Sequence, residues 1–146
     1  MKLFAIIITF WLAILTSPPV YAFTYYMATT GSDSVNGSQG TPWLTLRHAM
    51  TSMAGGDTLV IEDGTYVGVN NRLDQNYRPP TGTSTAYTII KARNEGAVTF
   101  DGENTTTMFE VEWGSGTTNV YWQFEGILWA RSPGTPNNEE LCRKIR

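Results

Sequence analysis

The chain has few residues of the types that cross-link proteins or bind metals. Cys142 is the single cysteine among 146 residues, so an internal disulfide framework is excluded and the fold must be stabilised by packing. His48 is the single histidine. We expect it on the solvent face of a helix, and no residue near it in sequence suggests a catalytic or metal-binding partner.

Positive charge is also scarce. The chain has 10 lysines and arginines against 13 aspartates and glutamates, which gives a net charge of −3. Nucleic acids and anionic membranes bind basic surfaces, so the composition argues against both as partners. An anionic polymer would be an awkward ligand unless a cation bridged it to the protein.

A long hydrophobic run is missing as well. The apolar segment at residues 4–15 is shorter than the roughly 20 residues that span a bilayer. It follows Lys2 and precedes Pro18-Pro19 and the small-residue motif Val20-Tyr21-Ala22. This order is typical of a secretory signal peptide. The sequence therefore predicts a leader at residues 1–22, cleavage after Ala22, and a secreted protein, extracellular or periplasmic, with no membrane contact after cleavage.

One amphipathic helix is expected near the start of the mature chain. Thr41 is a good N-cap and Pro42 suits the first helical position. A single apolar face then follows, and Gly55-Gly56 ends the helix. These features predict a capping helix at about residues 43–53, with an apolar face formed by Trp43, Leu46, Ala49, Met50 and Met53.

Short strands separated by turns follow this helix. Apolar and polar residues alternate in most of them, as at Leu59 and Ile61 or Val98 and Phe100, which is typical of strands with one buried face. Residues 69–86 are rich in Asn, Pro, Thr and Gly, and we expect a loop there. The predicted strands are residues 58–62, 87–92, 97–100, 108–112 and 119–125, with a bend at Gly126 before Ile127-Leu128-Trp129.

The recurrence of strand, Asp-Gly turn and strand favours a solenoid. Repeats of roughly 20 to 45 residues are typical of such folds, and a parallel β-helix needs a helical plug on its first coil. A β-sandwich also uses many short strands. It explains the single early helix less well.

Several segments of the chain form a recognisable set. They are Tyr25-Tyr26, Gly31-Ser32-Asp33, the helix start at Pro42, Gly56-Asp57-Thr58-Leu59-Val60-Ile61, Asp63-Gly64-Thr65-Tyr66, Thr88-Ile89-Ile90-Lys91-Ala92, Val98-Thr99-Phe100-Asp101-Gly102 and Phe124-Glu125-Gly126-Ile127. Together they resemble the N-terminal end of secreted pectate-lyase-like proteins. The resemblance covers residues 23–130 and implies a mainly β, right-handed, single-stranded parallel β-helix of about three coils.

The resemblance also implies a function. The chain is similar to polysaccharide lyases that act on acidic glycans, including the alginate lyase and chondroitinase B branch, so we expect a secreted polysaccharide-directed protein. In such lyases the catalytic base and the calcium ligands lie on later coils. The expectation is therefore a fragment that is inactive alone, with no catalytic, cofactor-binding or metal-ligating residue, although a full-length relative could bind calcium. The alternative is a non-catalytic extracellular glycan-binding or adhesin-type module.

A few charged and aromatic residues are candidates for chemistry. Lys91 and Arg93 are a basic pair near a strand that could bind a uronate, and Glu110, Glu112 and Glu125 could form a carboxylate cluster for calcium or glycosidase chemistry. For all of them a solvated strand face is the simpler interpretation. Other candidates are the turn aspartates Asp33, Asp57, Asp63 and Asp101, the sugar-stacking rings Trp113 and Tyr121, and the glycosylation motifs at Asn36 and Asn104.

The last segment, residues 131–146, lacks alternating apolar residues. We interpret it as an irregular tail, truncated or altered relative to a longer β-helix. With a cap at one end only, the last coil would leave open strand edges and expose rings such as Trp122 and Trp129. The sequence therefore predicts self-association through this end, and an extracellular polysaccharide, acidic or not, as the other partner.

Overall fold

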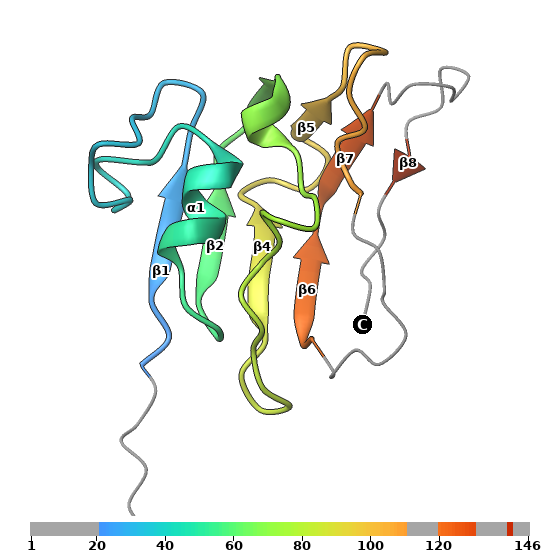
Figure 1. Ribbon diagram of the computed structural model, residues 1–146. Helices are drawn as coiled ribbons and strands as arrows, with labels where there is room; N and C mark the ends of the chain where they lie inside the picture. Colours follow the sequence, from blue (N-terminus) through green and yellow to red (C-terminus); the bar gives the residue numbers. More distant parts are fainter. Residues whose placement is uncertain (1–20, 111–119, 131–139, 142–146) are drawn as a thin grey trace, which may run out of the picture.

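The computed structural model describes residues 21–110, 120–130 and 140–141 (Figure 1). Of residues 140–141 only the backbone is described. Within these ranges the fold is mainly β, with little helix. Residues 1–20 of the predicted leader, Glu112, Trp113, Cys142 and most of the predicted tail lie outside the described residues. The described elements are β1 (Thr24–Met27), α1 (Leu46–Ser52), β2 (Thr58–Ile61), β3 (Gly64–Val67), the 3-10 helix η1 (Val69–Asn71), β4 (Thr88–Ala92), β5 (Val98–Asp101), β6 (Trp122–Glu125), β7 (Ile127–Ala130) and β8 (Glu140–Leu141).

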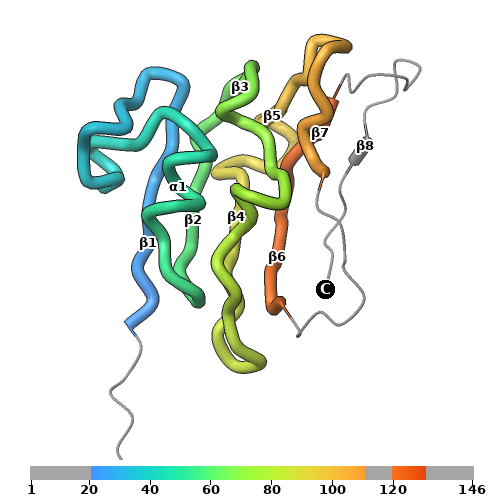
Figure 2. Tube along the Cα trace, in the orientation of Figure 1, coloured from blue at the N-terminus to red at the C-terminus, as the bar shows by residue number. Residues whose placement is uncertain are grey.

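The strands form two sheets, and from β2 to β7 the chain passes from one sheet to the other with each successive strand. One sheet has the order β1-β2-β4-β6 and the other β3-β5-β7-β8, as the trace in Figure 2 shows. All described pairs are parallel except β7 with β8. Thr24 pairs with Thr58, 34 positions later, and Thr58 pairs with Ile89, 31 positions later. Each sheet therefore grows by one strand about every thirty residues.

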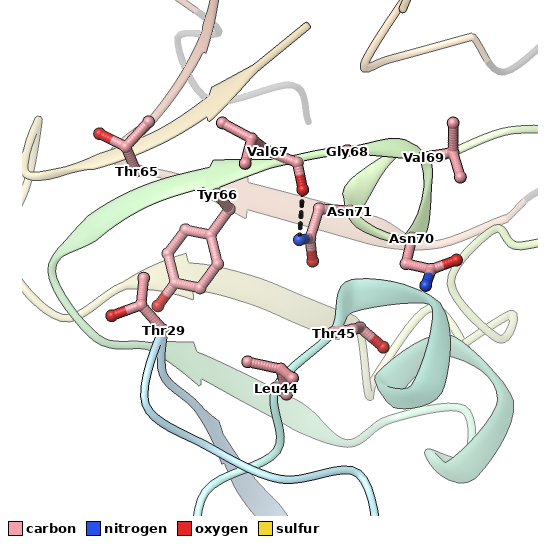
Figure 3. A pocket seen from close by; sticks show the side chains of 10 residues that line it. All are labelled: Thr29, Leu44, Thr45, Thr65, Tyr66, Val67, Gly68, Val69, Asn70 and Asn71. Carbon is pink, nitrogen blue, oxygen red and sulfur yellow. Dashed lines mark hydrogen bonds between the residues drawn. The ribbon is translucent and has the colours of Figure 1, made fainter.

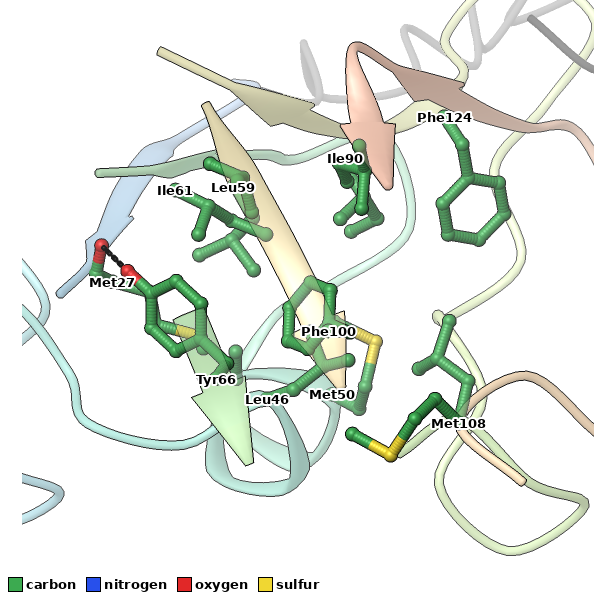
Figure 4. Close-up of a cluster of buried hydrophobic side chains, with 14 of the residues drawn as sticks. Met27, Leu46, Met50, Leu59, Ile61, Tyr66, Ile90, Phe100, Met108 and Phe124 are labelled. Atoms are coloured by element: carbon green, nitrogen blue, oxygen red, sulfur yellow. Dashed lines mark hydrogen bonds between the residues drawn. The ribbon is translucent and has the colours of Figure 1, made fainter. Parts of the chain in front are cut away.

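The core lies between the sheets. In the first sheet Leu59, Ile90 and Phe124 are register neighbours and are all buried. In the second sheet Phe100 pairs with Tyr66 and Trp129, and its ring stacks on Trp129 with centroids 4.8 Å apart. Figure 4 shows side chains from both sheets and from α1 meeting in one cluster. The alternation in the sequence thus identified the buried face of these strands correctly.

The helix is shorter than the sequence predicts. It begins at Leu46, and its N-cap is Thr45, whose hydroxyl accepts a hydrogen bond from the His48 amide. The prediction that Thr41 caps a helix from about residue 43 is wrong, because Trp43 pairs with β1. The Trp43 amide donates to the Tyr26 carbonyl at 2.8 Å. Backbone pairing with β1 therefore delays the helix by one turn.

Residues 69–86 are not a simple outward loop. After η1, Leu73 is fully buried, and its backbone forms a parallel bridge with Phe109. The Pro80 carbonyl accepts hydrogen bonds from the Thr88 hydroxyl at 2.7 Å and from the Trp122 indole at 3.2 Å. The segment is polar by composition but is anchored to the core at these points.

The C-terminal aromatic rings are covered, contrary to the expectation. Trp122 is 7% exposed and Trp129 is 5% exposed. Trp122 packs beneath the 69–86 segment, and the ring of Phe109 lies edge-on to Trp129 with centroids 5.1 Å apart. Leu128 of β7 also pairs with Leu141 of β8. In place of the predicted strand at residues 108–112, the described residues of that segment form only the backbone bridge between Phe109 and Leu73. Strand β8 falls within the predicted irregular tail.

Candidate functional site

A surface groove of about 500 Å³ lies where the helix cap meets the second sheet. Residues 65–71, from β3 and η1, form one wall, and Thr29, Leu44 and Thr45 form the other (Figure 3). None of these ten residues carries a charge at neutral pH. The groove thus joins three segments that are far apart in the sequence.

The first wall is shaped by Gly68 and Asn71. Gly68 has a φ of 83°, which favours glycine and turns the chain from β3 into η1. The buried Asn71 amide then accepts a hydrogen bond from the Leu46 amide at 3.0 Å and donates one to the Val67 carbonyl at 2.9 Å. Asn71 therefore ties η1, in one wall of the groove, to the start of α1, next to Thr45 in the other wall.

Tyr66 lies at the base of the groove. Its hydroxyl donates to the Glu62 carbonyl at 2.8 Å. Burial, together with the negative charges of Glu62 and Asp63, raises the pKa of Tyr66 above its ordinary value. The phenol therefore stays protonated across the physiological range, and its role is to position the wall, not to transfer a proton.

The second wall is held by Asp33. Its carboxylate accepts hydrogen bonds from the Leu44 and Thr45 amides, both at 2.9 Å, and from the Thr45 hydroxyl at 2.7 Å. Burial alone would raise the pKa of Asp33, but these hydrogen bonds and the nearby His48 outweigh it and hold the pKa below its ordinary value. Asp33 is thus an ionised anchor outside the groove.

Three polar side chains in the groove are available to a ligand. Within the part of the chain that the structure describes, the hydroxyls of Thr29 and Thr65 and the amide of Asn70 make no hydrogen bond, and all three residues are exposed. Large apolar side chains on the same rim are also exposed, by 39% at Leu44, 45% at Val67 and 54% at Val69. The groove therefore presents neutral hydrogen-bonding groups beside apolar surface.

The predicted basic pair is not part of this groove. Arg93 forms two hydrogen bonds with the Glu62 carboxylate, at 2.5 and 2.6 Å, and its guanidinium lies 5.5 Å from the centre of the Tyr26 ring. The bond to Glu62 raises the pKa of Arg93. Lys91 lies between Val60 and Glu125 in the register of the first sheet. The pair thus sits on the outer face of that sheet.

The predicted carboxylate cluster is not observed in the described ranges. Glu110 is exposed, Glu125 accepts a hydrogen bond from Gln123, and Glu112 lies outside those ranges. The described residues contain no group of three or more His, Cys, Asp or Glu side chains that could hold a metal ion.

The turn aspartates bind backbone and amide groups. Asp101 accepts from the Glu103 amide and Asp57 from the Ala54 amide, as expected for turn chemistry. Asp57 also accepts from the distant Phe23 amide. Asp33 and Asp63 bind partners outside their own turns, and the partner of Asp63 is Asn94.

The remaining sequence candidates are separate from the groove. Tyr121 lies edge-on to Tyr87 with ring centroids 5.7 Å apart, and Trp113 lies outside the described residues. His48 is half-buried, not fully solvated as expected, because its ring packs edge-on against Trp43 at 5.2 Å. In the glycosylation motifs, Asn36 accepts hydrogen bonds from Ser38 and Thr41, and Asn104 has a φ of 58°.

Comparisons of the chain with protein-family models, with curated proteins and with solved structures gave no match. Among the residues that the structure describes, no helix is long and apolar enough to cross a membrane. The site must therefore be interpreted from its own chemistry.

Proposed function

We propose that the chain is a secreted glycan-binding protein built as a right-handed parallel β-helix. Each coil would contain one strand from each sheet, namely β2 with β3, β4 with β5, and β6 with β7. The support for this architecture is the alternation between sheets and the near-constant register spacing. Parallel crossovers are almost always right-handed. Helix α1 would cover the first coil.

The groove carries the proposal for the ligand. Sugars offer hydroxyl groups around a ring whose C–H faces are apolar, and the groove offers Thr29, Thr65 and Asn70 beside Leu44 and Val69. Its volume lies in the range of small-molecule sites, roughly 300 to 1,000 Å³. Because the lining is uncharged, a neutral saccharide fits it better than a uronate does. Cleavage of acidic glycans, which the family resemblance implies, is the competing proposal.

The direct test is calorimetric titration of the purified protein with neutral and uronate oligosaccharides. We expect binding of a neutral saccharide, and about fivefold weaker binding for Thr65→Ala or Asn70→Ala, since one neutral hydrogen bond contributes about 1 kcal/mol. Thr99→Ala is the matched control, because Thr99 is the register neighbour of Thr65 in β5 and lies outside the groove.

Two outcomes would count against this proposal. Equal affinity for the wild type, Thr65→Ala and Asn70→Ala would place the ligand elsewhere. Formation of an unsaturated product from an acidic glycan, followed by ultraviolet absorbance with and without calcium, would favour the lyase.

A further inference from the structure

The backbone at the predicted leader cleavage site is already placed against a buried carboxylate. The Phe23 amide nitrogen lies 2.8 Å from Asp57 Oδ1. Tyr21 is 74% exposed and Phe23 is 60% exposed, and β1 begins at the next residue, Thr24. The Ala22–Phe23 peptide bond is therefore accessible, while the nitrogen on its C-terminal side points into the protein.

Asp57 lacks a cationic partner among the described residues. It is 2% exposed, and the hydrogen bonds it accepts there come from the backbone amides of Phe23 and Ala54. The ion pairs in the same ranges are Arg72 with Asp74 and Arg93 with Glu62. A buried carboxylate is costly without a counter-charge, so a cation at this position would stabilise the fold.

We propose that leader cleavage supplies this cation. A leader peptidase adds water across the Ala22–Phe23 bond, which leaves a carboxylate on Ala22 and an amino group on Phe23. That amino group takes up a proton at neutral pH, since a free α-amine has a pKa near 8. The new α-ammonium of Phe23 then pairs with Asp57, so an ion pair replaces a hydrogen bond from a neutral amide.

The position of this nitrogen does not depend on the leader. The Thr58 amide donates to the Phe23 carbonyl at 2.8 Å, and Thr24 is in register with Thr58. Both contacts lie on the C-terminal side of the cleaved bond, so they persist after processing. Cleavage thus acts as a maturation step that fixes the first strand. The inference rests on the leader prediction and is independent of glycan binding.

The test begins with the whole chain, expressed with its leader in an exporting bacterial host. We expect the purified protein to start at Phe23, with the sequence Phe-Thr-Tyr-Tyr. Selective acetylation of its α-amine keeps the N–H donor but removes the charge. In the wild type this should lower the thermal midpoint by about 4 °C. In Asp57→Asn the same acetylation should change it by less than about 1 °C.

Asp63→Asn is the matched control, because it removes the same charge from an exposed aspartate and should leave the effect of acetylation unchanged. If Asp57→Asn does not fold, the acetylation rate of the wild type is compared in buffer and in urea by mass spectrometry. We expect at least threefold slower reaction of the folded protein, because a paired ammonium loses its proton less readily. Another N-terminus, equal rates, or equal midpoint shifts in both proteins would overturn the inference.

Discussion

Replacement of Phe100 by alanine is expected to lower the free energy of unfolding by about 4 kcal/mol. Phe100 is fully buried and lies in the middle of an aromatic row. Its ring centroid is 5.2 Å from that of Tyr66 in the neighbouring strand β3 and 4.8 Å from that of Trp129 in the neighbouring strand β7. Alanine would remove contacts to both neighbours and leave a cavity between three parallel strands.

The effect should be visible in urea denaturation followed by tryptophan fluorescence, to which Trp129 contributes through its stacking on Phe100. A small domain is stable by only about 5 to 15 kcal/mol, so the midpoint should fall by a large fraction. Thr99→Ala, one residue earlier in β5, should change stability by less than about 0.5 kcal/mol. Similar effects of the two substitutions would show that the aromatic row does not support the fold.

The strands could be predicted because alternation reports local geometry. Val98 and Phe100 are both buried, and the same holds for Trp122 and Phe124, since side chains on a strand point to opposite faces in turn. The sequence could not decide which side Ile89 or Ile90 faces, because both are apolar. The structure buries Ile90, and the register with Leu59 and Phe124 decides between them.

The start of the helix could not be predicted because two threonines compete for the cap. Thr41 followed by Pro42 is the better local signal, but Thr45 is the observed cap. The decision is tertiary, since Trp43 pairs with β1 and Asp33 holds the Leu44 and Thr45 amides. Contacts with residues 11 to 17 positions earlier therefore override the local preference.

The groove was missed for a related reason. Its walls come from Thr29, from residues 44–45 and from residues 65–71, which parallel pairing brings together. The only local signal is the sequence Gly68-Val69-Asn70-Asn71, a glycine and two amides next to a strand, and residues 69–71 belong to the segment that the sequence predicts as a loop. A binding surface made of threonine and asparagine has no spacing motif, unlike a metal or nucleotide site.

Removal of the Asp33 carboxylate is expected to be the most destabilising polar substitution in the segment that leads into helix α1. Asp33→Ala would leave the Leu44 amide, the Thr45 amide and the Thr45 hydroxyl without their acceptor. Hydrogen bonds to a charged group contribute about 1.5 to 3 kcal/mol, so we expect a loss of about 2 kcal/mol at pH 7. Asp63→Ala is the control, since Asp63 is exposed and accepts a single side-chain hydrogen bond from Asn94.

The loss should also depend on pH in a defined direction. The pKa of Asp33 is lower in the folded protein than its ordinary value, so its contribution is fully present above the unfolded pKa, near 3.9, and is lost as pH falls through the folded pKa. The gap between wild type and Asp33→Ala should therefore be constant from pH 5 to 7 and narrow below about pH 4.

The pKa of Asp74 is also lowered in the folded protein, so the pH dependence of stability contains a contribution from Asp74 as well. Burial raises the pKa of Asp74, but Arg72 and the Asn76 and Tyr77 amides outweigh it and lower the pKa overall. Both proteins will lose stability in acid through Asp74, so the difference between their unfolding free energies isolates Asp33. A gap that stays constant down to pH 2 would mean that the Asp33 side chain stabilises the cap by packing alone, without its charge.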